Sequence, residues 1–249
     1  MFSENHILIL IISAAMTAIA TAVSVRAKLS SKKASIIFFV ICCASEIVKD
    51  LSNIIPSSSG GFVLDPNDIP LHLCSVVVFM MLYIVVSKNS EKREHIKTAV
   101  TVIGLVAPVF ALLIPTEGVS FSEIITYQYF IYHISLLWYA LHHVLTGQVT
   151  FGVKEYLRDL IYLGVTVMFL LYINSALSIY GVNYCFLREP PVDGLPILNL
   201  NHGWIVYFLV LLTIGVLSVT VVHLPSMIKE LSAKTSRKNT CREKPIKDN

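Results

Sequence analysis

Charge is what this sequence has least of. Only 14% of its 249 residues are Asp, Glu, Lys or Arg, whereas a soluble domain carries about a quarter. Hydrophobic residues make up 55% of the chain, and the mean hydropathy is +0.72. This composition excludes an ordinary soluble domain and indicates a polytopic membrane protein.

Several common signatures are also missing. The sequence contains no P-loop, no G-x-G-x-x-G, no H-E-x-x-H, no glycosylation sequon and no internal repeat, so no cofactor is predicted. Its five cysteines are an odd number without C-x-x-C spacing, which leaves at least one unpaired and indicates no metal site of that type. The last apolar segment has no lysine for a retinal Schiff base, which argues against an opsin.

Seven long apolar segments account for most of the chain. They cover residues 7–25, 34–54, 71–86, 96–114, 127–146, 157–180 and 203–223. Each is close to the ~20 residues that cross the hydrocarbon core of a bilayer. The runs are continuous rather than alternating, which is typical of helices. We therefore predict an all-α fold, with a seven-transmembrane-helix bundle over residues 1–225 and a disordered basic tail over 226–249.

Lys and Arg are absent from alternate connections. Connections 56–69 and 115–126 contain neither residue, and connection 181–202 contains only Arg188. Most of the other basic residues lie in or next to the other connections and in the tail, including Lys32, Lys92 and Arg158. By the positive-inside rule, the N-terminus is outside and the C-terminal tail is cytoplasmic, in the cell membrane. The tail has no aromatic residues, so no nucleic-acid partner is predicted.

This orientation places polar residues from different segments in one layer of the outer leaflet. At 1.5 Å per residue, Cys74 lies about 6 Å from the outer end of its helix, and His133 and Asn174 about 9 Å from theirs. Glu46 and Lys49 lie near the outer end of the second segment, at the i,i+3 spacing that brings side chains together. Ionisable residues within a membrane face the bundle interior and find partners. The pattern predicts a polar pocket that opens to the outside.

Each of these residues also has a structural interpretation. Glu46 and Lys49 form a plain ion pair in that case, Asn174 an interhelical hydrogen bond, and His133 a core contact within an aromatic run. His72 and Cys74 are about 200° apart on a regular helix, so both cannot face one narrow pocket. A cysteine beside a histidine from another helix is, however, a nucleophile–base arrangement.

Three segments carry a family resemblance: 71–75 (LHLCS), 129–133 (YFIYH) and 181–188 (GVNYCFLR). With them the chain resembles the YwaF-like family of bacterial integral membrane proteins, from the second apolar segment to the seventh. It departs from that pattern at Ile69, where the family has Leu, and at Cys185, where the family has Met or a similar apolar residue. Residues 195–204 resemble the family's stretch before the last helix only loosely.

A more distant resemblance implies a chemistry. Vertebrate multi-helix membrane lipid acyltransferases share a Leu-His-x-Cys at a helix start and a histidine on a later helix, whereas related animal hydrolases use a threonine nucleophile. The resemblance implies that Cys74 is the nucleophile and His133 its base.

The leading hypothesis is therefore acyl transfer or ester hydrolysis on a phospholipid or lysophospholipid. In it, His72 orients the substrate or a water. The remaining site residues bind the substrate or hold the oxyanion, together with backbone N–H groups. They are Asn174, Asn183, Tyr184, Glu46 and Lys49.

Two other classes of function remain open. A transporter or small-molecule binding protein would use Glu46, Lys49 and Asp50 in the outer pocket, although no internal repeat supports transport. A metal site would use His72, Cys74 and His133, since neutral imidazole and thiolate are suitable ligands. A through-path favours transport, three converging ligand atoms favour a metal, and a Cys–His pair beside a groove open to lipid favours the enzyme.

Overall fold

The computed structural model confirms the all-helical class. It describes residues 3–56, 62–63, 65–116, 119–192 and 194–242, which contain seven α-helices. Each helix coincides with one of the predicted apolar segments. The helices are α1 (Glu4–Arg26), α2 (Ser31–Ser52), α3 (Leu73–Val86), α4 (Ser90–Leu113), α5 (Ile124–Leu145), α6 (Val153–Ala176) and α7 (Trp204–Arg242).

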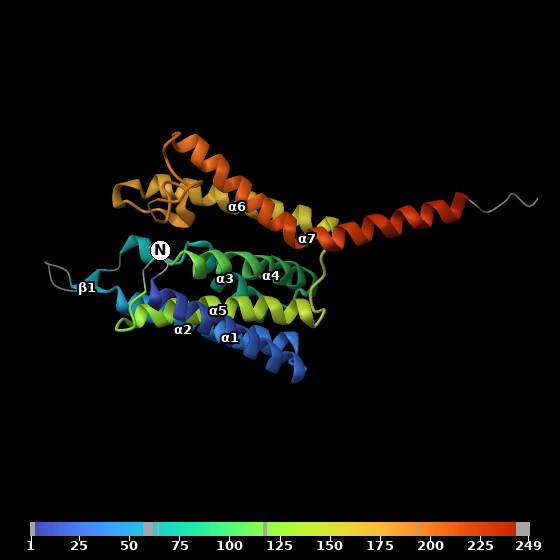
Figure 1. The fold of residues 1–249 in the computed structure, drawn as a ribbon, viewed down its shortest axis with the longest axis horizontal. Helices are drawn as coiled ribbons and strands as arrows, with labels where there is room; N and C mark the ends of the chain where they lie inside the picture. Colours follow the sequence, from blue (N-terminus) through green and yellow to red (C-terminus); the bar gives the residue numbers. More distant parts are fainter. Residues whose placement is uncertain (1–2, 57–61, 64, 117–118, 193, 243–249) are drawn as a thin grey trace, which may run out of the picture.

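The connections at one end of the bundle contain short elements that the sequence pattern did not predict. A two-residue strand β1 (Ile55–Pro56) pairs antiparallel with β2 (Phe62–Val63), and 3-10 turns follow at η1 (Pro66–Asp68), η2 (Ser178–Tyr180) and η3 (Tyr184–Phe186). We name this end, shown at the left of Figure 1, the site end. The opposite end, with connections 27–30, 87–89 and 146–152, is named the basic end.

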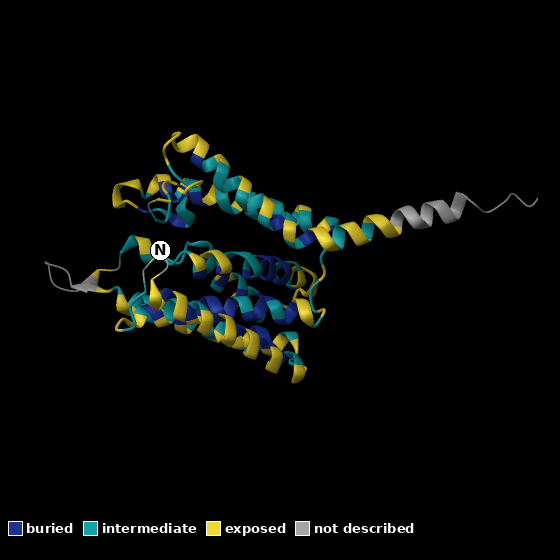
Figure 2. Cartoon of the chain, in the orientation of Figure 1, coloured by how far each residue is buried: buried dark blue, intermediate teal, exposed yellow. Residues whose placement is uncertain are grey.

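Helices α1 to α5 form one body, in which α5 packs against α1, α2 and α4, and α3 packs against α2 and α4. Its core is a cluster from α2, α3, α4 and α5 that includes Phe38, Val77, Val100 and Leu136. Figure 2 shows the buried residues gathered on these helices. Helices α6 and α7 pack on each other and reach the rest of the bundle through α4 (Figure 1).

One glycine sets the distance between α4 and α5. A Cβ on Gly104 would lie 2.9 Å from the Ala140 Cβ and 2.9 Å from the Leu136 carbonyl oxygen. Both distances are far below ordinary contact, so only glycine allows the two backbones to approach this closely. This contact fixes α5, and with it Tyr132 and His133, against the body of the bundle.

Polar contacts join α6 to α7 near the basic end. The buried side chains of His223 and Asp159 are hydrogen-bonded, with His223 Nε2 2.9 Å from Asp159 Oδ2. The Tyr156 hydroxyl lies 3.1 Å from that of Thr220, and the Val153 N–H donates to the Glu230 carboxylate at 3.2 Å.

Helix α7 continues well past the predicted seventh segment. The sequence pattern predicted a disordered tail from residue 226, whereas the structure extends the helix to Arg242, with Pro225 inside it. Residues 226–242 contain neither Gly nor Pro and include several strong helix formers, which accounts for the continuation.

Four helices of the described chain are long and apolar enough to cross a membrane. They are α1, α4, α6 and the Trp204–Ala233 part of α7, and α3 is a shorter apolar helix. Helices α2 and α5 contribute the polar side chains Glu46, Lys49 and His133. The sidedness of the two termini stays a prediction.

Candidate functional site

Two predicted motifs meet at the site end through a tyrosine. Cys74 is the second residue of α3, and His72 is the N-cap of that helix. Tyr132, buried on α5, donates a short hydrogen bond from its hydroxyl to the Cys74 carbonyl oxygen. The first turn of α3 is therefore fixed to α5 one residue before His133.

His133 is buried, and its ring lies nearly perpendicular to that of Tyr132, with the centroids 5.4 Å apart. Its Nδ1 is 2.7 Å from the Tyr129 carbonyl oxygen. A carbonyl oxygen only accepts hydrogen bonds, so Nδ1 carries the proton and Nε2 carries the lone pair of the neutral ring. Nε2 is therefore the basic nitrogen. That Nε2 lies within reach of the Cys74 sulfur stays a prediction.

His72 has the opposite arrangement of ring nitrogens. The Cys185 backbone N–H donates a long hydrogen bond of 3.4 Å to His72 Nδ1. Nδ1 therefore accepts, and Nε2 of the neutral ring carries the proton. The His72 ring also packs against Tyr184 and Phe186, with centroids 5.7 and 5.3 Å away. One histidine of the site end thus offers a base, and the other offers a donor.

Asn174 and Asn183 both hold the loop that covers His72. The Asn174 amide donates to the Tyr184 carbonyl oxygen at 3.0 Å and accepts from the Tyr184 N–H at 2.8 Å. Asn183 donates to the Glu189 carbonyl oxygen at 3.0 Å. The Tyr184 hydroxyl donates a short hydrogen bond to the Pro66 carbonyl oxygen, which ties this loop to η1. In this structure the two amides bind backbone and position the loop.

Cys185 belongs to the site more closely than its loop position suggested. Its φ of 54° lies in the left-handed region, which costs a non-glycine residue roughly 1–2 kcal/mol. Its thiol lies 3.7 Å from the Leu71 carbonyl oxygen. Burial raises the pKa of the Cys185 thiol to about 12, so the thiol is protonated at neutral pH and donates to that oxygen.

The charged residues of α2 contact one another. Lys49 Nζ lies 2.6 Å from Glu46 Oε2 and 3.9 Å from Asp50 Oδ1, and the Glu46 and Lys49 side chains are mostly buried. The structure thus pairs Glu46 with Lys49, as their i,i+3 spacing predicted. Their place beside Cys74 and His72 in one site stays a prediction.

The geometry gives little support to a metal centre. Among the described residues, no three His, Cys, Asp or Glu side chains lie where they could hold a metal ion together. His72, Cys74 and His133 therefore do not meet the criterion of three converging ligand atoms.

Sequence reasoning missed two contacts of the site. One is the Tyr132 hydroxyl on Cys74, for which the position of Tyr132 directly before His133 was the available signal. The other is the contact of Cys185 with residues 71–72. It depends on a left-handed backbone at residue 185, and a cysteine there gives no sign of that conformation.

The sequence model described as the TMEM164 family matches residues 1–223. No curated protein and no solved structure matches the chain.

Proposed function

The chain belongs to the TMEM164 family, and we propose that it is a multi-pass enzyme of the cell membrane that transfers or hydrolyses lipid acyl groups. The expected membrane class is confirmed by the family, whereas the likeness to YwaF-like proteins and to acyltransferases supports only the proposal. Cys74 is the nucleophile, His133 is its base, and a phospholipid or lysophospholipid is the substrate.

The observation that carries the proposal is the junction of α3 with α5. Tyr132 fixes the first turn of α3, and the next residue, His133, has its Nδ1 occupied by the Tyr129 carbonyl. A free cysteine has a pKa near ~8.5 and is mostly protonated at neutral pH, so it needs a base to react. The lone pair on His133 Nε2 fits that requirement.

In the proposed reaction, His133 Nε2 takes the thiol proton and the Cys74 thiolate attacks the ester carbonyl carbon. The C–O bond to the lipid alcohol then breaks, and the alcohol leaves with the proton from the His133 imidazolium. This leaves a thioester on Cys74. Water or the hydroxyl of a lysolipid then attacks the thioester carbon and gives its proton to His133. The C–S bond breaks, the acyl product leaves, and the Cys74 thiolate takes the proton back from the His133 imidazolium.

The start of α3 provides donors for the oxyanion. His72 gives this helix no side-chain cap, and Val76 is the residue whose N–H bonds to the His72 carbonyl oxygen. The N–H groups of Cys74 and Ser75 therefore have no partner within the helix. N–H groups beside the attacking sulfur are suitable donors for a tetrahedral oxyanion. The His72 Nε2–H would orient the ester or a water.

A fatty-acyl thiol-reactive probe tests the proposal on the purified protein. We expect Cys74 to be labelled and Cys74→Ser to lose both labelling and transfer of a labelled acyl chain from phospholipid to lysophospholipid. His133→Ala should slow both reactions by on the order of 10²–10⁴-fold. Cys185→Ser is the matched control and should retain activity.

Two results would contradict the assignment: full activity in Cys74→Ser, or loss of activity in Cys185→Ser alone. If no acyl chain moves while a solute binds near Glu46, Lys49 and Asp50, the binding-protein or transporter alternative replaces the enzyme.

A further inference from the structure

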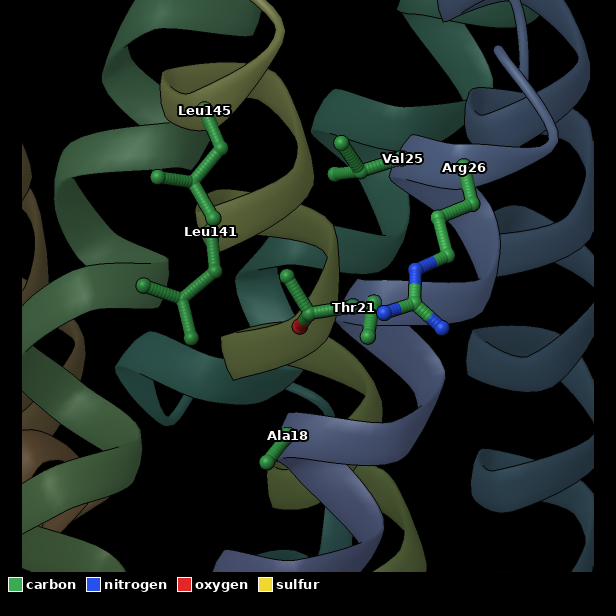
Figure 3. Close-up of a pocket in the computed structure, with 7 residues that line it drawn as sticks. Ala18, Thr21, Val25, Arg26, Leu141 and Leu145 are labelled. Carbon is green, nitrogen blue, oxygen red and sulfur yellow. The ribbon is translucent and has the colours of Figure 1, made fainter.

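A groove of about 420 Å³ lies between α1 and α5 (Figure 3). It is near the basic end, at the opposite end of the bundle from Cys74. Its walls are Ala18, Thr21, Ala22, Val25 and Arg26 from α1 and Leu141 and Leu145 from α5. The groove exists because the two alanines on α1 are too short to fill the space in front of the α5 leucines. Its lining is apolar except for Thr21 and Arg26.

Arg26 supplies a charge at one end of this groove. It lies in the last turn of α1, and Figure 3 shows its guanidinium turned back along the helix toward Thr21. None of the ion pairs among the described residues includes Arg26. An exposed guanidinium beside an apolar groove is suited to a ligand with an anionic head and an apolar chain.

Thr21 also lines the groove, but its hydroxyl oxygen is buried and is not accessible from the groove. The residue is only 6% exposed, and its Oγ1 has no hydrogen-bond partner among the described residues. Ser13 bonds to the Ile9 carbonyl and Thr98 to the Glu94 carbonyl four residues earlier, whereas the Thr17 hydroxyl, one turn before Thr21, also has no partner among the described residues. The Thr21 hydroxyl makes no such bond, and it lies about 7.5 Å along the helix from Arg26.

We propose that this groove binds an anionic glycerophospholipid from the leaflet at the basic end. The acyl chain lies along the alanine and leucine walls, and the phosphate pairs with Arg26. Arginine binds phosphate in a bidentate manner, and the groove has the size of a small-molecule site. This lipid is separate from the substrate proposed at Cys74 and does not depend on that proposal.

The neighbouring charges favour an acidic lipid over a zwitterionic one. Lys28, Lys32 and Lys33 follow Arg26 at the same end of the bundle. Each basic residue near a membrane surface favours anionic lipid by about 1 kcal/mol, but only Arg26 lines the groove. The preference within the groove should therefore depend on Arg26 more than on the lysines.

Tryptophan fluorescence can test this site, because the chain has only two tryptophans. Trp138 on α5 donates to the Ser24 hydroxyl on α1 at 3.0 Å, so it reports on the α1–α5 contact. In a Trp204→Phe background, the full chain is placed in bilayers with rising fractions of phosphatidylserine or phosphatidylcholine that carry brominated chains. We expect phosphatidylserine to quench Trp138 at a lower mole fraction than phosphatidylcholine.

Matched variants separate the head-group contact from the chain contact. Arg26→Gln should weaken the phosphatidylserine effect about fivefold, the equivalent of one basic residue, whereas Lys32→Gln should change it much less and Arg26→Lys should keep it. Ala22→Phe should reduce quenching by both lipids because the ring fills the groove. Ile19→Phe adds bulk at an exposed position of α1 outside the groove and should leave quenching unchanged.

Three results would overturn the proposal. The first is equal quenching by the two lipids in the parent protein, and the second is an unchanged phosphatidylserine preference in Arg26→Gln. The third is that neither lipid quenches Trp138 while the α1 helices of two copies can be cross-linked to each other. The last result would assign the groove to a second copy of the chain. Unchanged Trp138 emission in bilayers without bromine shows that each variant is folded.

Discussion

At the residue scale, one hydrogen bond of His133 decides which of its ring nitrogens can act as a base. Because Nδ1 donates to the Tyr129 carbonyl oxygen, a side chain that keeps this donor but has no second ring nitrogen separates structure from chemistry. His133→Asn has such a side chain. We expect it to retain a melting temperature close to that of the parent but to lose acyl transfer and Cys74 labelling by on the order of 10²-fold or more.

Thermal unfolding and probe labelling should be measured on the same preparation of His133→Asn. A purely structural histidine would give the reverse outcome, in which the melting temperature falls and the labelling rate per folded molecule stays the same.

Tyr132 is the residue that connects α5 to the start of α3. Tyr132→Phe removes only the hydroxyl that donates to the Cys74 carbonyl oxygen. Losing one such hydrogen bond should lower the free energy of unfolding by about 1 kcal/mol. Because the first turn of α3 also loses its anchor, Cys74 labelling should slow severalfold, as measured by the rate of probe incorporation.

The control for Tyr132→Phe is Tyr129→Phe, which removes a similar hydroxyl bonded to the Ala111 carbonyl oxygen at 2.8 Å. It should cost similar stability without slowing the labelling. Equal labelling rates in the two variants would argue against a positioning role for Tyr132.

At the scale of helices, the contact of α4 with α5 depends on the missing side chain of Gly104. Gly104→Ala would place a Cβ 2.9 Å from Ala140 and from the Leu136 carbonyl. Overpacking of this kind costs typically about 1–3 kcal/mol, and the clash involves backbone that cannot move aside locally. We expect a clear drop in the melting temperature of the protein in detergent.

Gly164→Ala is the matched control on α6, because no atom lies within 4 Å of the Cβ that it adds. Alanine is the better helix former by about 1 kcal/mol, so this variant should be neutral or slightly more stable. A destabilisation as large as that of Gly104→Ala would mean that helix propensity, and not the close approach, explains both results.

The helices were predictable from sequence because continuous apolar runs have few alternatives in a bilayer. The short strands at 55–56 and 62–63 were not, because two-residue pairings arise from the path of a connection rather than from a repeating pattern. The length of α7 was missed for a different reason: a charged segment after an apolar run resembles a disordered tail, although its residues favour a helix.

The candidate site was predictable only in part. Depth along each helix placed Glu46, Lys49, Cys74 and His133 in one layer, since 1.5 Å per residue is fixed by geometry. The contact of Cys185 with His72 and Leu71 depends on the left-handed backbone at residue 185. Such a turn is dictated by tertiary contacts, here the Asn174 amide on Tyr184.

At the scale of the whole molecule, α6 and α7 form a layer of their own. Many of their large side chains, such as Val165, Met168 and Leu209, are exposed, and Figure 2 shows these two helices mainly in the colours of exposed and partly buried residues. Exposing apolar surface to water costs about 25 cal/mol of free energy per Å², whereas exposing it to the hydrocarbon of a bilayer does not. The exposed apolar faces therefore agree with the membrane class of the family.

The sidedness of the molecule gives the last prediction. Connections 27–30 and 146–152 lie at the basic end, and the loop that contains Tyr184 and Cys185 lies at the site end (Figure 1). Because Lys and Arg gather at and next to the basic end, the positive-inside rule places that end in the cytoplasm. A reporter fused after Asn249 should therefore read as cytoplasmic, and one inserted in connection 181–202 should read as external.

A third reporter in connection 146–152 serves as the control for these fusions and should agree with the one after Asn249. The proposed lipid site beside Arg26 would then face the cytoplasmic leaflet, and Cys74 the outer leaflet. If the reporters after Asn249 and within 181–202 read the same side, α7 does not cross the membrane. The seven-span arrangement would then have to be replaced by one in which α7 lies along the surface.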